Sequence, residues 1–219
     1  MGKPIKLSDR GKPWAIRSLD RKVDVRPERE RILIVCEGAK TEPNYFKSIK
    51  NLLPKQVASV IDVEGEGFNT QSLVDYAKQK RDAKKDSDYP YDEIWVVFDR
   101  DSFKPDAFDN AIHSAEAMEM KVAWSNEAFE LWYILPFEAR QTGMSRTEYK
   151  DCLTKHLGTP YLKNDSDIHS KLQTRGNESE AIQRAKSLQT LHPGTPHNGA
   201  NPCTTVNDLV EKLNSFINS

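Results

Sequence analysis

Two stretches decide the fold, ILIVCEG at residues 32–38 and IWVVFDRD at residues 94–101. Each is a continuous apolar, β-branched run that ends in carboxylates, Glu37 in the first and Asp99 and Asp101 in the second. Continuous apolar runs of this length are typical of strands buried on both faces, as in a parallel sheet. In open α/β sheets, ligands bind beyond the carboxyl ends of the strands. The sequence therefore predicts a site at that edge of a parallel sheet.

Strands and helices alternate along the first two thirds of the chain. We expect strands at residues 32–36, 57–63, 93–98 and 121–124, and helices that begin near Thr41, at Asn69 or Thr70, at Pro105, and at Ser125 or Asn126. This order favours a parallel sheet with right-handed crossovers. The predicted fold is α/β, with a mainly parallel four-stranded sheet flanked by helices.

The chain divides into three predicted regions. Residues 1–30 are polar and basic with three prolines, which indicates a flexible arm that is either solvated or in contact with nucleic acid. Residues 31–140 hold the α/β domain. Residues 141–219 form a helical C-terminal extension, in which 192–202 is a loop rich in turn-forming residues.

Composition excludes several classes of protein. The 219 residues carry a net charge of −1, so no global basicity indicates nucleic acid. Three scattered cysteines without a C-x-x-C pair support neither a disulfide framework nor a zinc ribbon. The five histidines show no ligand-like spacing, and we expect no zinc at His192 and His197. Without a long apolar segment or a secretory signal, we expect a cytoplasmic protein that binds no membrane.

The carboxylates at the strand ends suit a divalent cation. Asp99 and Asp101 are two apart and project from the same side of an extended chain, and Glu37 joins them if the two strands are neighbours. Oxygen ligands of this kind suit Mg²⁺, which can polarise a phosphodiester. Glu37 could instead be a general acid or base, because crowding raises one carboxyl pKa. The competing interpretations are turn or capping residues and a phosphoaspartate enzyme.

Further candidates lie near this edge. Glu42, in the first turn of a helix, either stabilises the helix terminus or lies near the metal. Glu127 and Glu130 share one helix face, and Glu130 is either a metal carboxylate or an ion-pair residue. Candidate nucleic-acid contacts, each of which could also be an ordinary surface residue, are Lys40, Arg100 and Lys163.

Four motifs together resemble the RloB-like family: CEGAKTEPNYF at 36–46, VFDRD at 97–101, SNEAFELW at 125–132 and NPCTTV at 201–206. The resemblance covers residues 31 to about 215. It implies a Toprim-like domain, the Mg²⁺-binding fold of topoisomerases, primases and OLD-type nucleases. In Toprim proteins a Glu follows the first strand and D-x-D the third, and these roles fall on Glu37, Asp99 and Asp101. The family resemblance also implies a role in anti-phage defence, often beside restriction or abortive-infection genes.

We therefore expect a Mg²⁺- or Mn²⁺-dependent nuclease acting on DNA or RNA. Its catalytic residues are Glu37, Asp99 and Asp101, and Glu42 and Glu130 support the metal. The alternative is a non-catalytic metal- and nucleic-acid-binding subunit whose partner ATPase or restriction-modification protein supplies the activity. A phosphotransferase toxin is disfavoured, because the only Gly-rich segment, EGEG at 64–67, is acidic. The kind of nucleic acid, the trigger and a homo-oligomeric state remain open.

Overall fold

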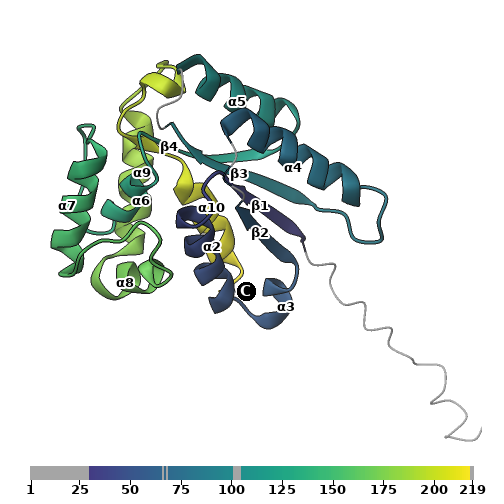
Figure 1. The fold of residues 1–219 in the computed structure, drawn as a ribbon, viewed down its shortest axis with the longest axis horizontal. Helices are drawn as coiled ribbons and strands as arrows, with labels where there is room; N and C mark the ends of the chain where they lie inside the picture. The colour runs from purple at the N-terminus through teal and green to yellow at the C-terminus, as the bar shows by residue number, and fades with distance from the viewer. Residues whose placement is uncertain (1–29, 66, 68, 101–104, 218–219) are drawn as a thin grey trace, which may run out of the picture.

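The computed structural model describes residues 30–65, 67, 69–100 and 105–217 (Figure 1). Its centre is a five-stranded sheet with the order β2-β1-β3-β4-β5. The strands are β1 (Ile32–Cys36), β2 (Ile61–Gly65), β3 (Glu93–Asp99), β4 (Lys121–Asn126) and β5 (Cys203–Thr204). The first four run parallel and β5 is antiparallel to β4. The predicted α/β class is confirmed, with one strand more than expected.

Helices cover both faces of the sheet. They are α2 (Thr41–Leu52), α3 (Lys55–Ala58), α4 (Thr70–Lys84), α5 (Pro105–Ala117), α6 (Glu130–Ile134), α7 (Arg146–Leu157), α8 (Ile168–Arg175), α9 (Glu178–Thr190) and α10 (Val206–Ser215). Successive strand residues point to opposite faces. Leu33 and Val35 therefore pack in a cluster with α4 and α5, whereas Ile32 and Ile34 pack in a second cluster with α2 and α10. Figure 1 shows these two pairs of helices on opposite faces of the sheet.

The C-terminal third shares the second cluster. Buried residues of α7, α8 and α9 belong to the same hydrophobic core as α2 and α6. Helix α7 begins with a capping box between Ser145 and Glu148 and is followed by Gly158, whose φ of 65° suits a residue without a side chain. Residues on both sides of position 140 thus contribute to one core, and the division into an α/β domain and an extension remains a prediction.

Three local predictions are corrected by the structure. Residues 57–60 do not belong to a strand, because Pro54 opens the short helix α3 and β2 starts only at Ile61. Ser125 and Asn126 do not cap a helix but end β4, where the Asn126 amide donates to the carbonyls of His197 and Asn198.

Strand β5 is the third difference. The sequence analysis predicted no strand in the C-terminal extension, but Cys203 and Thr204 extend along β4 before α10 begins. The Thr204 hydroxyl hydrogen-bonds the Ser125 hydroxyl at 2.8 Å, and both side chains are fully buried. A strand of two residues carries too little periodicity to be recognised from sequence.

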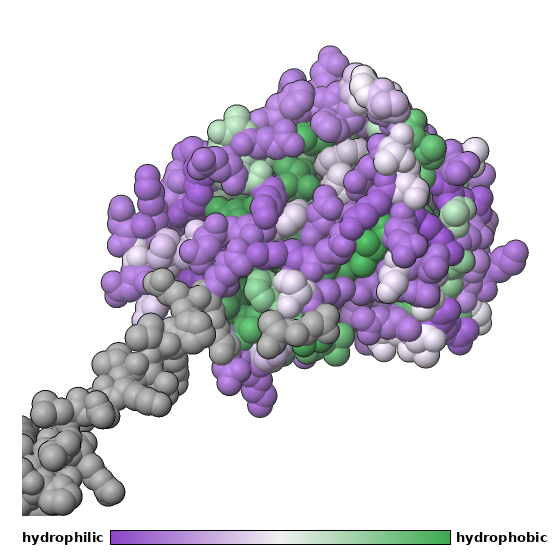
Figure 2. Space-filling model, turned by 180° about the vertical axis from the view of Figure 1, so that it is seen from behind, coloured by the Kyte–Doolittle hydropathy of each residue, from purple (hydrophilic) through white to green (hydrophobic). Residues whose placement is uncertain are grey.

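The visible surface in Figure 2 is mostly hydrophilic, with small hydrophobic areas between polar side chains. Within the described ranges, no helix is both long and apolar enough to cross a membrane. The predicted arm, apart from Glu30, lies outside the described residues, as does Asp101.

Candidate metal and nucleic-acid site

Glu37 and Asp99 meet at the carboxyl edge of two neighbouring strands. Strands β1 and β3 pair in parallel, with Cys36 opposite Val97. The Glu37 N–H continues this ladder by donating to the Val97 carbonyl at 2.9 Å. The Asp99 N–H then donates to Oε2 of Glu37 at 3.3 Å. The Glu37 carboxylate is thereby held against the backbone of Asp99, the last residue of β3.

The Asp99 side chain is held from the other side. Asp99 is 9% exposed, and its Oδ2 accepts a hydrogen bond from the Phe129 N–H at 3.3 Å. Phe129 directly precedes α6, so this bond attaches the start of that helix to the end of β3. The Arg100 N–H donates to the Ser125 carbonyl at 3.0 Å and ties the same point to β4. Asp99 thus has a defined position between three elements.

Glu42 is a buried carboxylate at the start of α2. It is 5% exposed, and its Oε2 has no hydrogen-bond partner among the described residues. A Cβ at Gly38 would lie 2.1 Å from that oxygen, so the carboxylate occupies the space that a side chain at Gly38 would fill. Gly38, which lies in the bend between β1 and α2, therefore makes room for the Glu42 carboxylate.

The environment of Glu42 resists its ionisation. Burial is the main cause that raises the pKa of Glu42, and the negative charge of Glu130 raises it further. The positive charge of Lys163 and the backbone N–H groups of Glu42 and Gly38 lower it in part. Glu42, Glu130 and Lys163 therefore interact electrostatically, although α2, α6 and the segment after α7 are far apart in sequence.

Glu130 is surrounded by two tyrosines that the sequence analysis did not single out. Tyr161 donates to Oε1 of Glu130 at 3.0 Å. Burial is the main cause of the raised pKa of Tyr149, and the charges of Glu127, Glu130 and Asp99 add to it. The Tyr149 hydroxyl is buried without a partner among the described residues. A phenol O–H in this position is a donor available to a bound anion or water.

A pocket of about 290 Å³ opens beside Glu130. Its lining combines one acid, three cations and two apolar or aromatic residues: Glu130, Arg146, Lys150, Tyr161, Leu162 and Lys163. The Thr41 hydroxyl donates to the Lys163 carbonyl at 3.0 Å, which fixes this segment against the start of α2. Three cations at the rim of a pocket that also contains a carboxylate suit a phosphate bound near a metal.

The structure describes all three residues that were predicted to contact nucleic acid, Lys40, Arg100 and Lys163. Lys40 is exposed immediately before α2, and Lys163 is exposed at the pocket. Arg100 is partly buried, and its Nε has no hydrogen-bond partner among the described residues. Asp101 lies outside the described residues, so its predicted role is carried only by the motif.

Sequence reasoning missed Arg146, Lys150, Tyr149 and Tyr161. Arg146 and Lys150 are four apart, which places both on one face of a helix. That spacing was visible in the sequence, but it did not reveal that α7 packs against α6 beside Glu130.

The chemistry of the acidic residues suits a hard divalent cation such as Mg²⁺ or Mn²⁺, although no three carboxylates of this edge have ligand atoms within 4.8 Å of one another among the described residues. Glu37, Asp99, Glu42 and Glu130 offer only carboxylate oxygens, which are the ligands that Mg²⁺ prefers. The orphaned Oε2 of Glu42 is a buried acceptor whose desolvation a cation would compensate.

Comparison with known proteins agrees with the motifs. The family model described as "RloB-like protein" matches residues 32–213. The chain belongs to the RloB-like family. The match covers all five strands and the site residues on them, so the resemblance inferred from four short motifs is confirmed. Searches of curated proteins and of solved structures returned no match.

Proposed function

We propose that this RloB-like protein is a Mg²⁺- or Mn²⁺-dependent nuclease that cleaves phosphodiester bonds of DNA or RNA. The observation that carries the proposal is the meeting of Glu37 and Asp99 at the ends of adjacent parallel strands, with the hydrogen bond from Asp99 N–H to Glu37 Oε2 at 3.3 Å. Open α/β sheets place ligands at this edge. The Rossmann-like sheet and the family membership agree with a Toprim-like arrangement of the same carboxylates.

In the proposed mechanism, Glu37 and Asp99 would hold the metal together with Asp101, and Glu42 and Glu130 would complete the acidic surroundings. A bound cation would polarise the phosphodiester and favour ionisation of an attacking water. The Phe129 N–H fixes the orientation of the Asp99 carboxylate, and Gly38 leaves the space that keeps Glu42 in place. Positioning of this kind lowers the cost of assembling the reacting groups.

The pocket beside Glu130 supports binding of the nucleic-acid backbone. Arg146, Lys150 and Lys163 can contact phosphate groups there, which offsets the repulsion between the site carboxylates and a polyanion. This local basic rim explains how a chain with a net charge of −1 can bind nucleic acid. The anti-phage setting, and a partner ATPase or restriction-modification protein, are proposed from the family resemblance alone.

The proposal is tested by incubating the purified protein with plasmid, single-stranded DNA and total tRNA. Each substrate is tested with Mg²⁺, with Mn²⁺ and with a chelator, beside Glu37→Gln and Asp99→Asn variants. We expect cleavage of at least one substrate that requires the metal and is lost in both variants. Metal binding without cleavage of any substrate would favour the non-catalytic alternative. Cleavage that persists in both variants would refute the assigned site.

A further inference from the structure

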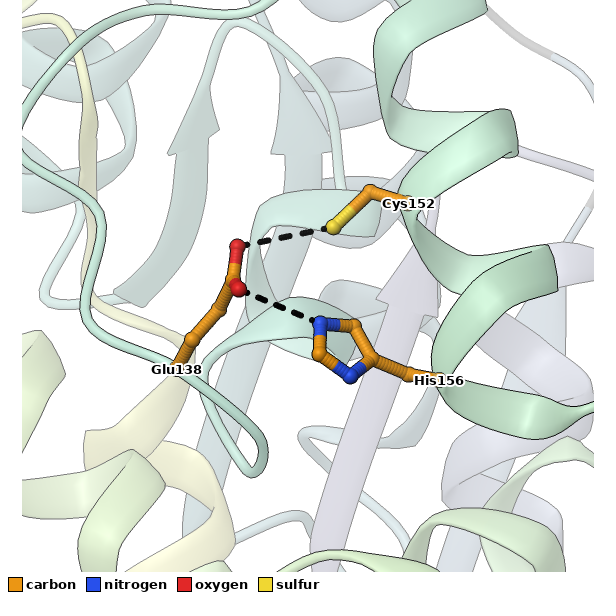
Figure 3. A group of neighbouring side chains, drawn as sticks. All are labelled: Glu138, Cys152 and His156. Carbon is orange, nitrogen blue, oxygen red and sulfur yellow. Dashed lines mark hydrogen bonds and ion pairs between the residues drawn. The ribbon is translucent and has the colours of Figure 1, made fainter.

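A second group of side chains that could hold a metal ion lies between α7 and the segment after α6 (Figure 3). Cys152 and His156 are one turn apart on α7, and Glu138 reaches them from the segment after α6. One ligand atom from each residue lies within 4.8 Å of the other two. The three side chains converge from two segments of the chain on one point (Figure 3).

The separations between these atoms match those of a tetrahedral zinc site. Zinc bonds of about 2.0–2.2 Å to nitrogen and oxygen and about 2.3 Å to sulfur imply nitrogen–oxygen distances of roughly 3.3 Å and sulfur–oxygen distances of roughly 3.5 Å. His156 Nε2 lies 3.2 Å from Glu138 Oε2. Cys152 Sγ lies 3.5 Å from Glu138 Oε1. The two distances end on different oxygens of Glu138, so an ion bound through Oε2 requires the Cys152 side chain or the Glu138 carboxylate to shift, starting from ligand atoms within 4.8 Å of one another.

The His156 imidazole faces the Glu138 carboxylate (Figure 3). His156 Nε2 is buried and makes no hydrogen bond within the described part of the chain, although Glu138 Oε2 is at ion-pair distance. The ring stacks on Phe137, with centroids 4.7 Å apart and an interplanar angle of 6°. Stacking fixes the ring plane while Nε2 faces the carboxylate, so a ligand nitrogen is already oriented before an ion binds.

Arg140 is the other charged group at this cluster. Its guanidinium contacts Glu138 Oε1 at 2.5 Å and Cys152 Sγ at 3.8 Å. An ion bound by Oε2 leaves the contact of Arg140 with Oε1 in place, and an outer hydrogen bond of this kind orients a ligating carboxylate. A Zn²⁺ ion with one thiolate, one carboxylate and a neutral imidazole is formally neutral, so Arg140 adds a single positive charge outside the ligands.

We propose that Glu138, Cys152 and His156 form a site for Zn²⁺ or a similar thiophilic divalent cation, with water as the fourth ligand. Thiolate and imidazole favour zinc over magnesium, so this site differs chemically from the all-carboxylate edge at Glu37 and Asp99. The ion joins the segment after α6 to α7, the helix that carries Arg146 and Lys150 of the pocket. The proposal does not depend on nuclease activity.

The site was not predicted because its ligands are recognisable only together. Cys152 and His156 have a spacing of four, which on a helix places both on one face. The third ligand is 14 residues before Cys152, and only the packing of α7 against the preceding segment brings it near.

The test uses Co²⁺ as a spectroscopic probe of zinc sites. Purified, chelator-treated full-length protein is titrated with Co²⁺, and the thiolate-to-cobalt charge-transfer absorption is recorded before and after addition of Zn²⁺. We expect one Co²⁺ per chain, a charge-transfer band, and loss of the band when Zn²⁺ displaces Co²⁺. The band should disappear in Cys152→Ser and fall strongly in His156→Gln and Glu138→Gln. It should remain in His113→Gln, which changes an exposed histidine, and in Asp99→Asn.

Thermal unfolding provides a second measurement, because a cation that binds only the folded state raises the unfolding temperature. Zn²⁺ should stabilise the wild-type protein and His113→Gln but not His156→Gln. Absence of the charge-transfer band in the folded wild-type protein would overturn the proposal. A band that is unchanged in Cys152→Ser would also overturn it, because the thiolate would then come from another cysteine.

Discussion

The backbone N–H of Asp99 donates to Oε2 of Glu37 at 3.3 Å, across the ends of strands β3 and β1. This bond joins two carboxylate-bearing residues that are 62 positions apart in the sequence. The Phe129 N–H fixes Asp99 from the opposite side at 3.3 Å. Substitutions that break either hydrogen bond should weaken metal binding more than they lower the free energy of unfolding.

Gly38→Ala should weaken the site through Glu42. An added Cβ would lie 2.1 Å from Glu42 Oε2, so the carboxylate must leave its position. Overpacking of this kind costs about 1–3 kcal/mol. We expect a lower free energy of unfolding in urea and a lower affinity for Mn²⁺. Adding Glu42→Ala to Gly38→Ala should restore part of the stability, because the overlap is removed. If the losses of unfolding free energy in the two single variants simply add in the double variant, the overlap between the added methyl group and Glu42 is contradicted.

Glu42→Gln should stabilise the protein in the presence of a chelator. Burial raises the pKa of Glu42, which means that holding it ionised at neutral pH costs free energy. Each unit of pKa difference is worth about 1.4 kcal/mol, and 1 kcal/mol shifts the unfolding temperature of a chain this size by about 2–4 °C. With saturating Mn²⁺, the wild-type protein should gain more stability than Glu42→Gln. If Mn²⁺ raises the unfolding temperature of both proteins by the same amount, Glu42 does not contribute to the metal site.

His169 should make stability depend on pH. It is 2% exposed, and burial lowers its pKa from 6.5 to about 4. Above pH 6.5 the ring is neutral in both the folded and unfolded states. Between pH 6.5 and about 4 the unfolded state binds a proton that the folded state does not, so stability falls as pH falls, by about 3 kcal/mol at most. Urea unfolding of His169→Gln should show a smaller loss over this range, and a parallel pH profile would contradict the assignment.

Lys150→Ala and Lys163→Ala should weaken nucleic-acid binding without changing the fold. Both residues line the pocket beside Glu130, and loss of one phosphate contact lowers the slope of log affinity against log salt by about 1. Replacing the Lys163 side chain leaves its carbonyl bond with Thr41 intact. Binding is measured in chelator at several salt concentrations. Lys55→Ala is the control, because this exposed lysine precedes β2 at the amino end of the sheet. An equal change of slope in all three variants would show that the pocket is not the site that binds the phosphate groups.

The sequence predicted the parts of the fold that rest on long, regular patterns. Strands β1 and β3 were predicted because their apolar runs are continuous. Asn69 was one of two predicted N-cap residues, and the hydrogen bond that it accepts from the Ser72 N–H shows that it is the N-cap. Strand β5 was missed, because two residues beside β4 gain their structure from tertiary hydrogen bonds. The same limit applies to Asn126, whose side chain bonds a loop 71 positions away instead of a helix terminus.

The sequence predicted most directly those site residues that lie at the end of an apolar strand. Glu37, which follows β1, and Asp99, which ends β3, are visible as abrupt ends of apolar runs. The pairing of Glu42 with Gly38 depends on side-chain packing, and the pocket depends on how α7 lies beside α6. The cluster of Glu138, Cys152 and His156 needs the same packing.

The most direct test of the central claim is metal-dependent cleavage by wild-type protein beside Glu37→Gln and Asp99→Asn. Glu116→Gln, which changes an exposed carboxylate away from the strand ends, is the matched control. All four proteins are first shown to unfold at similar temperatures, and initial rates are then measured against Mn²⁺ concentration on the substrate that the wild-type protein cleaves best. We predict that both site variants lose about 100-fold or more in rate, whereas Glu116→Gln retains the wild-type rate. Wild-type rates in Glu37→Gln and Asp99→Asn, or cleavage that persists in chelator, would contradict the account.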